Sequence, residues 1–142
     1  MKAKTILLVE DDELDVISVE RSLKKIDLDI SLHTAYNGIE ALGKLKGDGY
    51  DKIPLPDIIL LDLNMPRMNG IEFLKSLRKE SDFDPVKIFV MTTSNEEKDR
   101  NETEKLGIAG YIIKPLNFND NTKRSSSMDS FMHFQIVKIL GS

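Results

Sequence analysis

The chain has 142 residues, of which 40% are hydrophobic and 31% are charged, with a formal net charge of −4 and no cysteine. This composition fits one globular domain, excludes a disulfide framework and argues against a nucleic-acid-binding protein, which would carry a basic patch. The first apolar run, Ile6–Val9, is too short for a signal-peptide core or a membrane span. We therefore expect a single domain over residues 1–142 that resides in the cytoplasm and binds neither nucleic acid nor membrane.

Strand and helix patterns alternate along the first half of the chain. The expected elements are a strand at Thr5–Val9, a helix at Glu13–Lys25, a strand at Ile30–Ala35 and a helix that begins after Asn37. The first helical segment repeats apolar residues every three or four positions, which gives a helix one apolar face. Asn37 and Glu40 are spaced like a capping box at the start of the second helix, and Gly47 is expected to end it.

The second half is organised around Ile58–Leu61, where four apolar residues follow one another. A run without polar alternation is typical of a strand that is buried on both faces of a sheet. Asn69 and Glu72 then predict the start of another helix. The remaining expected elements are a strand at Val86–Met91, a helix at Glu96–Leu106, a strand at Tyr111–Ile113 and a helix at Met128–Leu140.

Five strands that alternate with helices require crossover connections, which predicts a parallel sheet with helices on both faces. The carboxyl ends of parallel strands meet at one edge of the sheet, where ligands of such folds bind. The polar residues that follow the strands would gather at this edge: Glu10, Asp11, Asp12, Asp62, Asn64, Thr92, Thr93 and Lys114.

Each of these residues has an ordinary explanation when it is taken alone. Asp11 and Asp12 could cap a helix, Thr92 could bind backbone groups, and Lys114 could be a solvated surface charge. Together they are harder to explain in this way, because adjacent carboxylates repel one another. A divalent cation that prefers oxygen ligands would relieve the repulsion, and Mg²⁺ suits a site of a few carboxylates.

The same residues, taken in order, carry a resemblance to a known family. The pattern is an acidic pair after the first strand, an aspartate after the third, a glycine at the next helix, a threonine after the fourth strand and Lys-Pro after the fifth: Asp11-Asp12, Asp62, Gly70, Thr92 and Lys114-Pro115. The chain resembles the response-regulator receiver domains of two-component signalling. The resemblance implies a doubly wound (βα)5 flavodoxin-like three-layer sandwich whose parallel sheet has the order 2-1-3-4-5.

The resemblance also implies a function in phosphorelay signalling. Asp62 would accept a phosphoryl group from a histidine kinase or a histidine phosphotransfer protein, so the protein would be a phosphoacceptor that assists its own phosphorylation and dephosphorylation, not an enzyme in the usual sense. Mg²⁺ would be held directly by Asp12 and Asp62. The backbone carbonyl of Asn64 would be a further ligand, and Asp11 would act through water.

Three further positions receive roles from the resemblance. Lys114 would pair with a phosphoryl oxygen, and Thr92 would donate its hydroxyl to another once Asp62 is phosphorylated. Tyr111 stands at the position of the family's switch aromatic; the ordinary alternative is an exposed tyrosine with a solvated hydroxyl. The run Thr92-Thr93-Ser94 and the small size resemble receivers that phytochrome-like or hybrid kinases serve.

The output of such a protein would be a contact with an unknown downstream protein. A weak homodimer is also expected, formed through the fourth helix, the fifth strand and the last helix, because Phe131, Met132 and Phe134 supply more apolar surface than one side of that helix needs.

Three other functions fit the sequence less well. A haloacid-dehalogenase-type phosphatase would need a general acid two residues after Asp62, and Asn64 cannot protonate a leaving group. A flavin-binding module would need phosphate-binding Ser, Thr or Gly after the first strand, where this chain has three acids. A receiver that has lost phosphorylation is disfavoured because every position that the family needs is filled.

Overall fold

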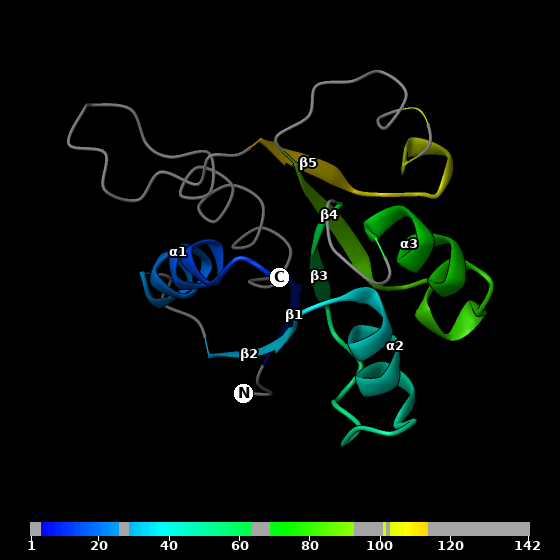
Figure 1. The fold of residues 1–142 in the computed structure, drawn as a ribbon, viewed down its shortest axis with the longest axis horizontal. Coiled ribbons are helices and arrows are strands. Elements are labelled where there is room, and N and C mark those ends of the chain that lie inside the picture. Colours follow the sequence, from blue (N-terminus) through cyan, green and yellow to red (C-terminus); the bar gives the residue numbers. More distant parts are fainter. Residues whose placement is uncertain (1–3, 26–28, 64–68, 93–100, 102, 114–142) are drawn as a thin grey trace.

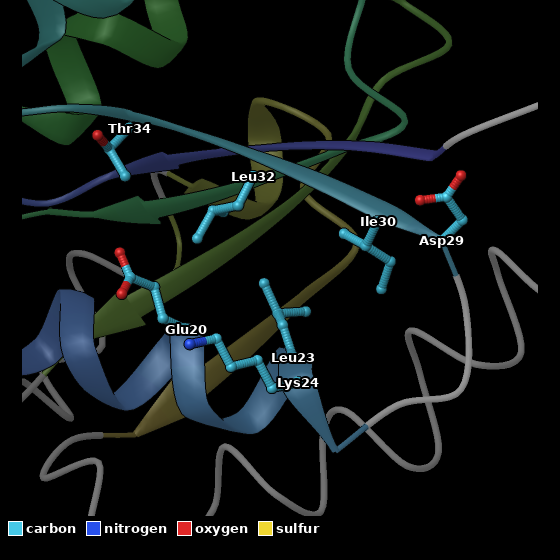
Figure 2. A pocket seen from close by; sticks show the side chains of 7 residues that line it. All are labelled: Glu20, Leu23, Lys24, Asp29, Ile30, Leu32 and Thr34. Atoms are coloured by element: carbon cyan, nitrogen blue, oxygen red, sulfur yellow. The ribbon is translucent and has the colours of Figure 1, made fainter.

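A computed structural model describes residues 4–25, 29–63, 69–92, 101 and 103–113 (Figure 1). Its centre is a five-stranded sheet of order β2-β1-β3-β4-β5, in which every strand pair is parallel. The strands are β1 (Lys4–Val9), β2 (Ile30–Ala35), β3 (Ile58–Asp62), β4 (Lys87–Thr92) and β5 (Gly110–Ile113). The predicted α/β class and the strand order 2-1-3-4-5 are confirmed.

The described helices cover both faces of the sheet. They are α1 (Glu13–Lys24), α2 (Gly38–Lys46) and α3 (Gly70–Arg78), with the one-turn 3-10 helix η1 at Ser81–Phe83. Figure 1 shows α1 on one side of the sheet and α2 and α3 on the other. Side chains alternate between the two faces along each strand, so Leu7 and Ile59 join the core under α2 and α3, whereas Ile6 and Ile58 join the core under α1.

The central strand β3 is buried along its whole length, as its unbroken apolar run predicts. Ile58–Leu61 have no exposed surface, and β1 and β4 pair with β3 on its two sides. Burial of one such side chain contributes about 1.5–3 kcal/mol to folding. The strand end that carries Asp62 is therefore fixed in a fully buried part of the sheet.

The predicted helix starts after Asn37 and Asn69 are confirmed. The Asn69 side chain accepts a hydrogen bond from the Glu72 backbone N–H at 2.9 Å, and the Glu72 side chain accepts one from the Asn69 N–H at 3.2 Å. The Asn37 side chain accepts one from the Glu40 N–H at 2.9 Å. Helix α2 ends at Gly47, whose φ of 73° lies in the left-handed region that glycine adopts without strain.

The fourth strand begins one residue later than predicted. Val86 donates its backbone N–H to the carbonyl of Phe83 at 3.1 Å, in the turn that follows η1, and β4 begins at Lys87. Val86 is 2% exposed. Its apolar character therefore reflects the burial of a turn that the sequence pattern did not predict.

Two predicted helices fall largely on residues that the structure does not describe. Of the helix expected at Glu96–Leu106, residues 101 and 103–106 are described; residues 101 and 103–105 are helical, and Leu106 lies in the turn that follows. The helix expected at Met128–Leu140, with Phe131, Met132 and Phe134, lies outside the described residues. Among the helices that are described, none is long and apolar enough to span a membrane.

Candidate functional site

Three carboxylates meet at the carboxyl edge of the sheet. Glu10, Asp11 and Asp62 each place a carboxylate oxygen within 4.8 Å of the others. The register explains the meeting, because Val9 of β1 lies opposite Leu61 of β3 and the acids follow these two residues. Glu10 and Asp62 are only 1% and 3% exposed, whereas Asp11 is exposed. Buried carboxylates need compensating hydrogen bonds or a cation, so the cluster has the composition of a cation site that solvent reaches beside Asp11.

Glu10 is held in the cluster by backbone hydrogen bonds on both sides. Its N–H donates to the carbonyl of Ala35 at 2.9 Å, which continues the pairing of β1 with β2 by one residue. One of its carboxylate oxygens, Oε1, accepts a hydrogen bond from the Asp12 N–H at 3.1 Å. The acidic side chain is therefore positioned by the sheet and by the turn into α1.

In the structure, Asp12 caps the start of helix α1. The interpretation of the sequence made Asp12 a direct metal ligand and Asp11 a water-mediated one. In the structure the Asp12 carboxylate accepts a hydrogen bond from the Leu14 N–H at 2.9 Å and caps α1, and Glu10 occupies the place in the cluster. An aspartate directly before the first helical residue satisfies a free N–H and meets the positive end of the helix.

Asp62 is the last residue of β3, and the start of α3 packs against its backbone. The Gly70 N–H donates to the carbonyl of Leu63 at 3.0 Å. A Cβ atom at Gly70 would lie 2.6 Å from the Asp62 carbonyl oxygen and 2.7 Å from Leu63 Cα. A side chain does not fit there, so glycine is required for α3 to begin this close to Asp62.

The other predicted site residues are described only in part or not at all. Thr92 is the last residue of β4 and lies opposite Ile113, the last residue of β5. The side chain of Thr92, the whole of Asn64 and the whole of Lys114 lie outside the described part of the chain. Their roles therefore remain predictions.

Tyr111 lies on β5 opposite Val90 of β4. Its side chain is partly buried against the core under α2 and α3. The Tyr111 hydroxyl forms a hydrogen bond with the hydroxyl of Thr103. The alternative of an exposed tyrosine whose hydroxyl is simply solvated is therefore wrong.

Three carboxylates at the carboxyl edge of a doubly wound parallel sheet define the class of protein. It is an α/β domain that binds an anionic group together with a divalent cation. The chain belongs to the response regulator receiver domain family, whose model matches residues 6–125. It is thus a phosphoacceptor of two-component signalling, and the phosphatase and flavin-binding alternatives are excluded.

Similar proteins support this assignment over most of the chain. Response regulator Rcp1 of Synechocystis sp. is 35% identical over 129 residues, which are 90% of this chain and 88% of that protein. The crystal structure of the Mn²⁺-bound form of Rcp1 matches with a TM-score of 0.81 at 32% identity, covering 92% of this chain and 93% of that one. The phosphorylated cyanobacterial phytochrome response regulator RcpA matches with a TM-score of 0.84 at 28% identity, over 96% of both chains.

Proposed function

We propose that Asp62 is the residue that accepts the phosphoryl group. It is the carboxylate of the cluster that stands at the end of the central strand, and Gly70 and the buried β3 fix its backbone. An Asp62 carboxylate oxygen attacks phosphorus in line, the P–N bond of a phosphohistidine breaks, and the histidine nitrogen keeps the bonding electron pair and takes up a proton. The product is an acyl phosphate on Asp62.

The proposed cation site consists of the carboxylates of Asp11 and Asp62, with Glu10 as their buried neighbour. The observation that carries this proposal is the convergence of three oxygen-donor side chains within 4.8 Å. Such a donor set suits Mg²⁺ or Mn²⁺, and we propose Mg²⁺ as the ion used. A divalent cation neutralises the charge that phosphoryl oxygens bring to an acidic site. The Asn64 carbonyl is proposed as a further ligand.

Lys114 and Thr92 are proposed to bind the phosphoryl group itself. Thr92 ends β4, which lies next to β3 in the sheet, and Lys114 follows β5, which lies next to β4. The Lys114 ammonium would pair with one phosphoryl oxygen, and the Thr92 hydroxyl would donate a hydrogen bond to another. Together with the cation they would also orient a water molecule for hydrolysis of the acyl phosphate, which makes the domain assist its own dephosphorylation.

The proposed partners follow from this chemistry. A histidine kinase or a histidine phosphotransfer protein would supply the phosphoryl group in the cytoplasm, and likeness to RcpA favours a kinase of the phytochrome type. We propose that residues 1–142 act as a single receiver domain. Its output would be a contact with a downstream protein, accompanied by a weak homodimer.

Labelling with a small phosphodonor tests the acceptor. Acetyl phosphate with Mg²⁺ should add one phosphoryl group to the wild-type chain, detected by intact-mass spectrometry, and should add none to Asp62→Asn. Asp48→Asn is the matched control, because Asp48 is an exposed aspartate in the loop after α2. Equal labelling of wild type and Asp62→Asn would assign the phosphoryl group to another residue.

A further inference from the structure

The Tyr111 hydroxyl is held by the hydroxyl of Thr103, which lies in the helical segment before β5. The Thr103 side chain forms a hydrogen bond with the Tyr111 hydroxyl. Thr103 is fully buried, although the residues that follow it, Glu104 and Lys105, are exposed. A buried hydroxyl is costly unless it is hydrogen-bonded. The hydrogen bond therefore joins the Tyr111 ring to a buried residue.

The backbone between these two residues is anchored from α3 and from β4. Arg78, the last residue of α3, donates hydrogen bonds from Nε to the carbonyl of Leu106 at 2.8 Å and from its Nη2 nitrogen to that of Gly107 at 2.9 Å. The Ala109 N–H donates to the carbonyl of Ile88 at 2.7 Å. The turn that leads into β5 is thus fixed before Tyr111 is reached.

Because the turn between Thr103 and Tyr111 is anchored, the Thr103 hydroxyl is placed to bond the Tyr111 hydroxyl in one position of the Tyr111 ring. Residues 103 and 111 lie on the two sides of the anchored turn, so the hydroxyl contact closes a loop whose backbone has little freedom to adjust. If the ring rotates toward solvent, its hydrogen bond with the Thr103 hydroxyl is broken. Rotation of Tyr111 therefore carries a penalty to which the Thr103 hydroxyl contributes one hydrogen bond.

We propose that Thr103 is a positioning residue for Tyr111 and holds its ring packed against the core under α2 and α3. Arg78 holds the turn between the two residues in place. The connection to signalling rests on the proposed function. Tyr111 lies opposite Val90 of β4. Val90 is two residues before Thr92, which is proposed to bind the phosphoryl group. A change in the position of the Tyr111 ring would be transmitted along this strand pair to Thr92. The Thr103 hydroxyl would therefore influence the affinity of the site for a phosphoryl group.

Nitration of tyrosine by tetranitromethane measures the packing of Tyr111 directly. The chain has three tyrosines, and Tyr36 and Tyr50 are 51% and 42% exposed, so they serve as internal references. Thr103→Val keeps the shape and removes the hydroxyl. It should raise the nitration rate of Tyr111 about two- to tenfold, the effect of one hydrogen bond, and leave the two references unchanged. Thr103→Ser, which retains a hydroxyl, should stay close to wild type.

Two results would overturn the proposal. The first is an unchanged nitration rate of Tyr111 in Thr103→Val; the second is the same increase in Thr103→Ser, which would assign the effect to packing instead of the hydroxyl. If the nitration rates of Tyr36 and Tyr50 rise as well, the variant is unfolding. The matching measurement is then the urea midpoint of Tyr111→Phe, which must fall below that of wild type if the hydrogen bond contributes.

A double-mutant cycle tests the connection with the phosphoryl site. With Mg²⁺ present, Thr103→Val should change the affinity for beryllofluoride, a phosphoryl mimic, by at least about threefold. In the Tyr111→Phe background the same substitution should have no effect, because the partner hydroxyl is already absent. Equal effects in both backgrounds would show that Thr103 acts without Tyr111. Acetyl phosphate labelling of Asp62 is measured separately, so a failure of the proposed acceptor is distinguishable from a failure of this proposal.

Discussion

Replacing Asp12 by alanine separates the two tasks that a carboxylate can have at the end of β1. As the cap of α1, Asp12 contributes to stability. As a cation ligand, it would contribute to Mg²⁺ affinity. The structure assigns it the first task, since its carboxylate accepts the Leu14 N–H at 2.9 Å and Asp11, not Asp12, shares the cluster with Asp62. Asp12→Ala should therefore affect stability, and Asp11→Ala should affect cation binding.

The magnitudes follow from the lost contacts. Removal of an aspartate N-cap costs about 1 kcal/mol, which for a domain of this size lowers the melting temperature by about 3–5 °C. Asp12→Asn keeps an equally good cap and should retain most of the stability, so the pair of variants separates the hydrogen bond from the charge. Loss of groups that merely support a ligand already weakens metal binding about 10–100-fold, so Asp11→Ala should weaken Mg²⁺ by at least about tenfold.

Thermal unfolding with and without Mg²⁺ reads out both quantities in one experiment. Saturating Mg²⁺ should raise the melting temperature of wild type and Asp12→Ala by similar amounts, because a ligand that binds the folded state stabilises it. It should raise that of Asp11→Ala much less. The reasoning is refuted if Asp12→Ala abolishes the Mg²⁺-dependent increase while Asp11→Ala preserves it, which would restore Asp12 as the ligand.

Three further substitutions have defined outcomes. Gly70→Ala should cost about 1–3 kcal/mol of unfolding free energy and slow acetyl phosphate labelling of Asp62 at least about tenfold; an unchanged labelling rate would contradict the close approach of α3. Gly43→Ala, whose Cβ would meet the Tyr50 ring at 2.3 Å and the Asp48 carbonyl oxygen at 2.9 Å, should lose stability in urea titrations but keep its labelling rate. Arg78→Met removes three hydrogen bonds to backbone carbonyls and should cost about 1–3 kcal/mol, whereas a cost near zero would show that the turn holds without it.

Much of this protein could be predicted from local sequence patterns. The alternation of short apolar runs with amphipathic segments determines a parallel sheet with helices on both faces, because parallel strands can be joined only by crossovers. The Asn-x-x-Glu pairs at Asn37 and Asn69 located two helix starts, since the cap is an interaction within one turn. Asp62 could be placed at the edge of the sheet because the apolar run of β3 ends directly before it.

The division of tasks among Glu10, Asp11 and Asp12 was decided by the tertiary structure. All three are acidic, and any of them can serve as a cap or as a ligand. Which side chain turns inward depends on where β1 stops pairing, and that point is set by the hydrogen bond from Glu10 to Ala35 on another strand. The Arg78 contacts with Leu106 and Gly107 likewise join residues 28 and 29 positions apart. Local patterns record the preferences of neighbouring residues; contacts between distant segments exist only once the sheet has formed, and these contacts select one use for residues whose chemistry permits several.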